Sequence, residues 1–489
     1  MTSGWKRSKK MKKNSTSISQ QKSARRKLHA AVRSLMFADL LAVLVLAPLA
    51  YGAVEAWAVA LFELNALLLA VLLALKFVLK PESKFRFHRL LLPLVALLLL
   101  GLVQIWPLHF FSQAAPSADV GTLSLDPYAT QQTVIKLLAL LIYFVVALKL
   151  FGNRERLRVL LVVLTWFGFA LAFFGIMQKL TWNGRLYWVR PISAGVPFGP
   201  FVNYNHFAGL MEMLFALPFA SLLFGEVSRE KRALWFFAAV MMAGSIVVSL
   251  SRGGLLALGV ELIAFGVISR LLRKRWRTSA IPKAFALSAL AAIALLALWI
   301  SYDQLAQRWK NLSGSATELS VAGRLEAWRN SWTMIREHPL TGVGLGAFPA
   351  IYPTYGQSSA YRERLEQTHN DYLQLLTDGG LVGGLIGLWF LAELLRLAWR
   401  QWLKISADRA GSRFERSLTI GSLIAVFGLL IHSFTDFNLQ ITSNSLFFLM
   451  MIAIATSFDR QSEPDQKNIE TLVQYASVSE RPGRTPGAR

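Results

Sequence analysis

Two short polar stretches in this 489-residue chain carry the residue types that chemistry requires. In Ser-Arg-Gly-Gly at residues 251–254, Arg252 precedes two glycines at the start of an apolar run. In His-Asn-Asp at residues 369–371, His369 precedes a second apolar run. A guanidinium beside the free N–H groups of a helix start binds anions, and imidazole accepts a proton from a hydroxyl near neutral pH. The two stretches therefore predict a site that holds an anion and deprotonates a hydroxyl.

Each stretch also has a plainer interpretation. Ser-Arg-Gly-Gly is also typical of a tight turn with a snorkelling arginine, and a lone histidine such as His369 is more often structural than catalytic. Asn370 and Asp371 are candidates to orient the imidazole of His369. The placement of the two stretches decides between these interpretations, so the elements around them matter.

The composition predicts an all-α polytopic membrane protein. Hydrophobic residues make up 54% of the chain and the mean hydropathy is +0.43, well above soluble domains. The apolar runs are about 18 to 24 residues long, enough to cross a hydrocarbon layer of about 30 Å as helices. A β-barrel would need alternating apolar and polar positions, which the leucine-rich run at 90–100 does not have.

Hydropathy and helix punctuation predict about twelve transmembrane helices. They lie near residues 35–52, 56–79, 89–106, 132–151, 157–178, 203–224, 233–250, 253–270, 281–301, 377–400, 417–434 and 440–457. The chain thus divides into a basic tail (1–34), nine spans (35–301), a long loop containing helices (302–376), three spans (377–457) and a C-terminal tail (458–489).

The distribution of charge predicts which side of the membrane each loop faces. About 40 of the 52 Lys and Arg residues fall in alternate inter-span segments and both tails, which the positive-inside rule makes cytoplasmic. Arg252 and the loop 302–376 then face outward, into the periplasm. This topology accounts for the net charge of +24, so we expect a lipid bilayer as partner and no nucleic acid. The absence of cysteine excludes disulfides and thiolate catalysis.

The long outer loop contains a predicted amphipathic helix at 323–337. Leu325, Trp328, Trp332 and Ile335 recur at helical spacing, while Arg324, Arg329 and Arg336 fall on other faces. Such a helix either lies on the membrane surface or roofs a cavity with its arginines turned inward. The two arrangements are compatible.

Several further polar residues are candidates for the site. Asn203 and His206, at the start of the sixth span, bind sugar hydroxyls or cap that helix. Glu212 and Glu261 fall inside predicted spans, where a carboxyl must be paired or line a polar cavity.

Asp436 could orient His369 or an arginine, or cap a helix after the eleventh span. Lys179, Arg185 and Arg190 add outer-face cations. No His-x-x-x-His and no Asp-x-Asp pair occurs on an outer loop, so we expect a site without metal or cofactor.

Together these stretches resemble the bacterial O-antigen ligase and polymerase superfamily. Arg252 to Leu256 match its Arg-x-x-x-Leu pattern, and His369, Asn370, Gly380 and Gly383 match its His-[Asn/Ser/Gln]-x9-Gly-x2-[Gly/Thr/Tyr] pattern. Further matching stretches are residues 199–209, 338–348 and 432–437. The resemblance covers roughly residues 180–440.

The resemblance implies a multi-pass enzyme of the bacterial inner membrane with a C-type glycosyltransferase-like fold and a site facing the periplasm. It implies an undecaprenyl-pyrophosphate-linked glycan as donor and an acceptor hydroxyl, with a single displacement that inverts the anomeric centre. Carried over by motif and loop position, Arg252 and Arg190, with Lys179, would hold the pyrophosphate, and His369 would activate the acceptor.

Three functions remain in view. Ligation of O-antigen to lipid A–core leads; polymerisation of glycan from the same donor is the alternative, and another branch of the superfamily glycosylates protein hydroxyls. A transporter is the distant third. It would show corresponding broken helices in two halves and charges near the midplane, whereas the distinctive polar residues of this chain gather on one face. The sequence does not specify the sugar or the oligomeric state.

Overall fold

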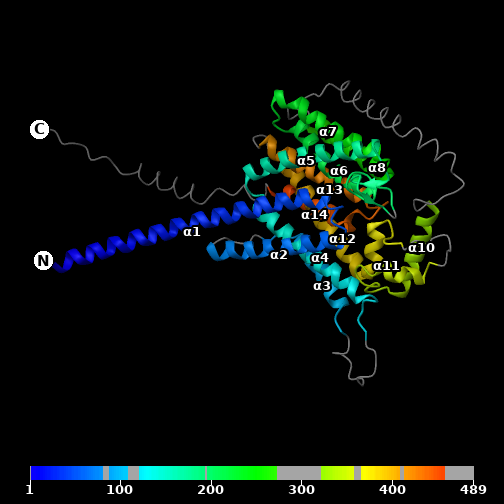
Figure 1. The fold of residues 1–489 in the computed structure, drawn as a ribbon, viewed down its shortest axis with the longest axis horizontal. Coiled ribbons are helices and arrows are strands. Elements are labelled where there is room, and N and C mark those ends of the chain that lie inside the picture. Colours follow the sequence, from blue (N-terminus) through cyan, green and yellow to red (C-terminus); the bar gives the residue numbers. More distant parts are fainter. Residues whose placement is uncertain are drawn as a thin grey trace, which may run out of the picture.

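The computed structural model describes residues 2–80, 87–107, 121–192, 195–272, 321–356, 365–407 and 412–457. The described part is a bundle of helices with one two-stranded hairpin (Figure 1). The longer helices are α1 (Thr2–Leu49), α2 (Ala56–Leu79), α3 (Leu91–Gln104), α4 (Pro127–Leu150), α5 (Arg154–Leu180), α6 (Tyr204–Phe224), α7 (Arg229–Ser249), α8 (Arg252–Leu272), α10 (Val321–Glu337), α12 (Asp371–Ala407), α13 (Arg413–His432) and α14 (Thr442–Ala455). Short elements are the antiparallel strands β1 (Arg185–Leu186) and β2 (Arg190–Pro191), helix α11 (Phe348–Ile351), and the 3-10 turns η2 (Tyr352–Thr354) and η3 (Asn438–Gln440).

The chain is an all-α polytopic membrane protein. Nine of the described helices are long and apolar enough to cross a membrane: α1 from Ser23, α2, α4, α5, α6, α7, α8, α12 and α13. The predicted spans at 89–106 and 440–457 correspond to α3 and α14, which have 14 residues each and are shorter than a full crossing needs. The predicted span at 281–301 lies outside the described residues. Helix α1 begins well before residue 35, so the basic segment before the first span continues the same helix.

Helices α6, α13 and α14 form the centre of the bundle. Every residue of α14 is buried, and so are most residues of α6. Both helices are therefore enclosed by other helices rather than by lipid. Helices α5, α7 and α8 pack against α6, and α1, α2, α3 and α4 complete the other side (Figure 1).

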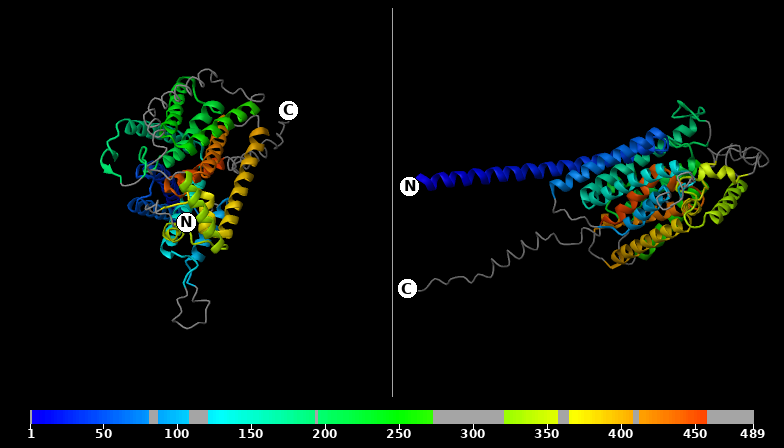
Figure 2. Two further views of the ribbon diagram at one scale, coloured as in Figure 1. Left: turned by 90° about the vertical axis from the view of Figure 1, so that its right-hand side faces the viewer. Right: turned by 90° about the horizontal axis from the view of Figure 1, so that it is seen from below.

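Short connections make the helices alternate in direction, so the bundle has two distinct ends. At one end lie Leu49, Gln104, Leu180, the starts of α6, α8 and α12, and the end of α13; we call this the site end. Hydrogen bonds join its segments: Gln104 Nε2 donates to Thr341 O (2.6 Å), and Asp371 N donates to Ser433 O (3.0 Å). The β1–β2 hairpin and α10 also lie here, away from the start of α1 (Figure 2, right).

Helix α12 is broken near the site end. Gly380 has φ +59° and ψ −155°, which separates residues 371–379 from the rest of this 37-residue helix. The backbone groups freed by the break are satisfied by the segment 339–344, since Val343 N donates to Thr377 O (3.0 Å) and Leu381 N donates to Pro339 O (2.8 Å). A broken helix in a membrane protein requires such compensation. The break thereby fixes residues 371–379, and His369 just before them, at the site end.

Candidate functional site

The candidate site is built around the turn of residues 432–437, which follows α13. His432 and Asp436 on this turn are buried, with 0% and 1% of their surface exposed. Elements far apart in sequence meet here: the start of α6, the first turn of α8, helix α10 and the segment before α12. The turn therefore adjoins several of the residues that the sequence singles out: His206, Glu212, Arg252, Arg324 and His369.

Asp436 lies between two histidines. Its Oδ1 atom is 3.5 Å from Nδ1 of His369 and 3.7 Å from Nε2 of His206. The ring of Phe437 packs edge-on against both imidazoles, with centroid distances of 4.9 Å to His369 and 4.6 Å to His206. Burial alone would raise the pKa of Asp436, but hydrogen bonding and charge from the two histidines hold it well below its usual range. Asp436 is thus an ionised carboxylate facing two imidazoles.

The segment before α12 is pinned in a defined conformation. His369 has φ +53°, a left-handed conformation uncommon for residues other than glycine. Trp328 on α10 donates its indole N–H to Thr368 O (3.0 Å). Asn370 Oδ1 accepts from the N–H groups of Tyr372 (3.0 Å) and Leu373 (3.1 Å), so Asn370 caps α12. The carboxylate beside His369 is therefore Asp436, and Asn370 serves the helix.

Arg252 opens α8 at the site end. Leu250 adopts φ +61°, which turns the chain, and Ser251 Oγ then accepts from Gly254 N (3.1 Å) as a helix cap. Arg252 is exposed, and within the described ranges it has no ion-pair partner. The first turn of α8 lies against the 432–437 turn, because a Cβ atom at Gly253 would be 2.5 Å from Oγ1 of Thr435.

A second arginine, Arg324 on α10, reaches the same turn. Its Nη1 donates to Thr435 O (3.3 Å), and its Nε is buried without a hydrogen-bond partner in the described part of the chain. Arg329 and Arg336 are exposed. Of the three arginines on this helix, Arg324 therefore reaches the turn.

The apolar face predicted for α10 is only partly packed against the protein. Leu325 and Trp332 on this face are 56% and 53% exposed. The buried positions are Ala327, Ser331 and Met334. Small side chains let α10 pack closely against its neighbours, which periodicity of large apolar residues could not reveal.

Arg190 and Lys179 occupy another part of the site end. Arg190 Nη2 forms an ion pair with Glu55 Oε1 (2.7 Å), and its guanidinium lies 4.4 Å from the ring centroid of Tyr51. The hydrogen bond to Glu55 raises the pKa of Arg190. Lys179 is half-buried near the end of α5. Among the described residues, the hydrogen bond and ion pair of Arg190 are made to Glu55 and not to the 432–437 turn.

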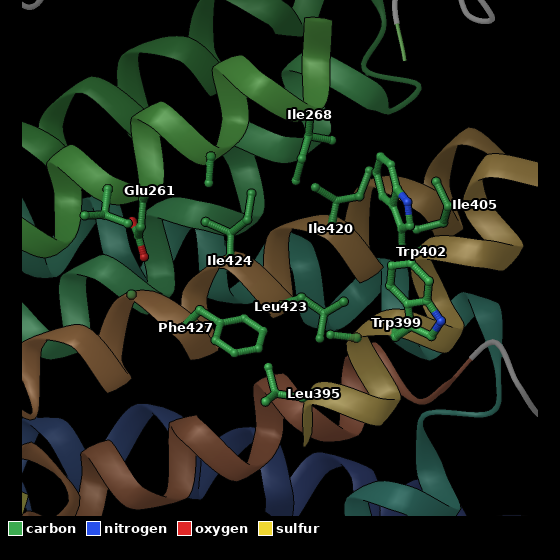
Figure 3. Close-up of a pocket in the computed structure, with 14 residues that line it drawn as sticks. Glu261, Ile268, Leu395, Trp399, Trp402, Ile405, Ile420, Leu423, Ile424 and Phe427 are labelled. Atoms are coloured by element: carbon green, nitrogen blue, oxygen red, sulfur yellow. The ribbon is translucent and has the colours of Figure 1, made fainter. Parts of the chain in front are cut away.

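The remaining candidates have mixed outcomes. Asn203 caps α6, with its Oδ1 accepting from Asn205 N (2.8 Å). Glu212 on α6 is paired, as expected, through Nδ1 of His432 (2.5 Å). Glu261 on α8 was expected to be paired or to line a polar cavity, and neither holds: its buried carboxyl has no hydrogen-bond partner among the described residues. It borders an almost entirely apolar pocket of about 490 Å³ beside Phe427 and Ile424 of α13 (Figure 3).

Comparison with protein families gives one match in this region. Residues 237–388 match the family model described as O-antigen ligase, a segment that contains Arg252, Arg324 and His369. This part of the chain is similar to the O-antigen ligase family. No curated protein matches the chain. The similarity and the apolar helices together indicate a multi-pass membrane enzyme of the O-antigen ligase and polymerase type, a class of glycosyltransferases.

Two contributors to the candidate site were not predicted from the sequence. Thr435 and Phe437 stand in a matching stretch, but only the folded turn shows that one accepts from Arg324 and the other packs against both histidines. In the sequence, the indication for Thr435 and Phe437 was that they are the neighbours of Asp436. Among the described residues no group of three or more His, Asp or Glu side chains is arranged to hold a metal ion, and metal independence remains a prediction.

Proposed function

We propose that this protein transfers a glycan from undecaprenyl pyrophosphate to an acceptor hydroxyl at the site end, with lipid A–core as the acceptor. The observation that carries the proposal is the 432–437 turn, where a histidine–carboxylate pair meets an arginine-flanked helix start. A base for a hydroxyl and a cradle for an anion are the two parts that such a transfer needs. Both adjoin one buried turn.

His369 acts as the general base in this proposal. The acceptor oxygen attacks the anomeric carbon while its proton passes to the imidazole of His369, and the bond from the anomeric carbon to the pyrophosphate oxygen breaks. Asp436 orients the ring and stabilises the imidazolium that forms. The single displacement inverts the anomeric centre, and the pyrophosphate leaves with its charge neutralised by the protein.

Arg252 and Arg324 are the cations that we assign to the pyrophosphate. Arg252 stands beside the N-terminus of α8, whose N–H groups and dipole favour an anion. Arg324 reaches the same turn, where among the described residues it donates to the carbonyl oxygen of Thr435. Arg190 already has Glu55 as its counterion. For Arg190 and Lys179 to hold the donor, Arg190 would have to exchange Glu55 for the pyrophosphate or share it. Arg324 is the better second cation.

The site end faces the periplasm in this proposal, with both termini in the cytoplasm. Support comes from the opposite end of the bundle, which carries Lys76, Lys149, Arg154, Arg229 and Arg413 near the helix ends. Such a concentration of cations is typical of cytoplasmic loops. The enzyme would then lie in the bacterial inner membrane and meet its lipid-linked donor in the outer leaflet.

The test is a transfer reaction with purified protein in nanodiscs. Glycan-loaded undecaprenyl pyrophosphate is offered with lipid A–core, and separately with a second molecule of donor. We expect a single glycan attached to lipid A–core. A ladder of products from the donor alone would make the protein a polymerase with the same chemistry, and no product in either reaction would refute the proposal.

A further inference from the structure

A buried acid–base pair lies directly beneath the first turn of α8 and has no part in the proposed chemistry. Glu212 on α6 and His432 at the end of α13 are both fully buried and are hydrogen-bonded to each other (2.5 Å). Nε2 of His432 has no hydrogen-bond partner among the described residues. Buried polar atoms are usually satisfied, so this arrangement calls for an explanation.

The free side of the His432 ring faces the start of α8. A Cβ atom at Gly253 would lie 2.6 Å from Nε2 of His432, closer than real Cβ contacts allow. A Cβ atom at Gly254 would lie 2.7 Å from Cβ of Ala208 on α6. The two glycines after Arg252 thus let the helix start settle onto the His432 ring on one side and onto α6 on the other.

The helix start held in this way has unused hydrogen-bond donors. Ser251 Oγ accepts from Gly254 N, and Ser251 O accepts from Leu255 N (2.8 Å). The N–H groups of Arg252 and Gly253 have no acceptor in the described part of the chain. Their direction, and the base of the Arg252 side chain, depend on how the first turn is seated.

We propose that the Glu212–His432 pair is a positioning device that seats the first turn of α8, and so aims Arg252 and the two free N–H groups at the diphosphate of the donor. Glu212 fixes the His432 ring through Nδ1, and the ring then braces the turn through its contact with Gly253. The inference rests on the proposed function, since it assumes that the start of α8 binds the diphosphate. His432 acts through Arg252 and touches no reacting atom.

The pair is poorly explained by stability alone. Replacing a buried ion pair by apolar side chains of similar volume is often neutral or stabilising. A histidine with one unpartnered nitrogen is a costly way to fill space between α6, α8 and α13. A fixed planar ring at a defined distance from a glycine is, by contrast, well suited to hold a helix start in one position.

Two glycine substitutions in the same helix test the contact. Gly253→Ala places a methyl group against His432, whereas Gly259→Ala meets nothing within 4 Å and is the matched control. We expect Gly253→Ala to weaken binding of undecaprenyl pyrophosphate, measured in nanodiscs, by about 10- to 100-fold, the range that a misplacement of about 1 Å produces. Turnover at saturating donor should change far less, because His369 is held by other contacts. Gly259→Ala should bind like the wild type.

A second pair of variants separates positioning from folding. His432→Asn keeps an N–H for Glu212 but removes the ring, so it should fold and still bind the donor weakly. In the double variant Gly253→Ala/His432→Asn the methyl group no longer meets the ring but still meets Oγ1 of Thr435, 2.5 Å from the Cβ position. The combined loss of affinity should therefore be smaller than the product of the two single losses. Glu212→Gln, which keeps an acceptor for His432, should lose less affinity than Glu212→Ala.

The outcomes distinguish this inference from the proposed function. Equal donor binding by Gly253→Ala and Gly259→Ala, or losses that multiply in the double variant, would overturn the positioning role. Arg252→Ala, measured in parallel, tests the site itself: if that variant binds donor normally, the diphosphate lies elsewhere and the proposed function fails first. Loss of binding in Arg252→Ala with normal binding in Gly253→Ala would refute the positioning role alone.

Discussion

At the scale of single residues, the proposed chemistry depends on Asp436. Its carboxylate faces His369 and His206, and its pKa lies well below the usual range. A group with a depressed pKa stabilises the folded state above its ordinary pKa of about 3.9, and loses that contribution as the pH falls through the folded value. Asp436 is therefore ionised throughout the neutral range, as a partner for an imidazolium must be.

Replacing Asp436 by asparagine should preserve the shape of the site and remove its charge. We expect Asp436→Asn to reduce turnover by about 10²- to 10⁴-fold, the range typical of general-base catalysis. Turnover at saturating donor and acceptor, measured at neutral pH beside the wild type, checks this. Wild-type turnover in a folded Asp436→Asn protein would show that His369 needs no carboxylate.

The sequence indicated where the candidate residues lie better than it indicated their contacts. His369, Arg252 and Asp436 stood in recognisable patterns, and each lies at the site end. The inward turn of Arg324 and the pairing of Arg190 with Glu55 depend on tertiary contacts between segments more than 100 residues apart. Asn370 was a candidate to orient His369, but it caps α12. Its short side chain reaches the free backbone N–H groups of the first helical turn.

At the scale of elements, the break in α12 is what delivers His369 to the site. Hydropathy predicted a span beginning near residue 377, and the apolar segment after Gly380 agrees with it. The segment 371–379 is a separate helical piece held by the loop 339–344. Hydropathy cannot show such a break, because both pieces are helical and they are separated by the backbone conformation of Gly380 alone.

Gly380 should therefore be intolerant of any side chain. Its φ of +59° with ψ −155° is a conformation essentially confined to glycine, and a Cβ atom would lie 2.5 Å from Leu340 O and Gly342 N. We expect Gly380→Ala to destabilise the protein by about 1–3 kcal/mol or more and to lower its unfolding temperature.

The matched control for that substitution is Gly266→Ala, in a regular part of α8 with nothing within 4 Å. Alanine is favoured over glycine inside a helix, so this variant should be unchanged or slightly more stable. Thermal unfolding in detergent compares the two. Equal unfolding temperatures would mean that α12 closes its break when a side chain is added.

At the scale of the whole molecule, the bundle separates a chemical end from a basic end. Nine of the described helices are long and apolar enough to span, and their alternation places Arg252, Arg324, His369 and Asp436 together, away from the cationic helix ends. Composition and charge alternation predicted this general plan, because helix length and loop charge follow directly from membrane insertion. Hydropathy did not predict that α3 and α14 would be shorter than a full span. Helix α14 is surrounded by protein, so it can be buried without crossing the bilayer.

The central claim is that Arg252 holds the donor and His369 removes the proton of the acceptor. Donor binding and turnover, measured separately on the same purified protein in nanodiscs, test it most directly. We predict that His369→Ala binds glycan-loaded undecaprenyl pyrophosphate like the wild type but does not transfer the glycan, while Arg252→Ala fails to bind it. Transfer by His369→Ala at the wild-type rate, or activity retained in His369→Arg, would contradict the account.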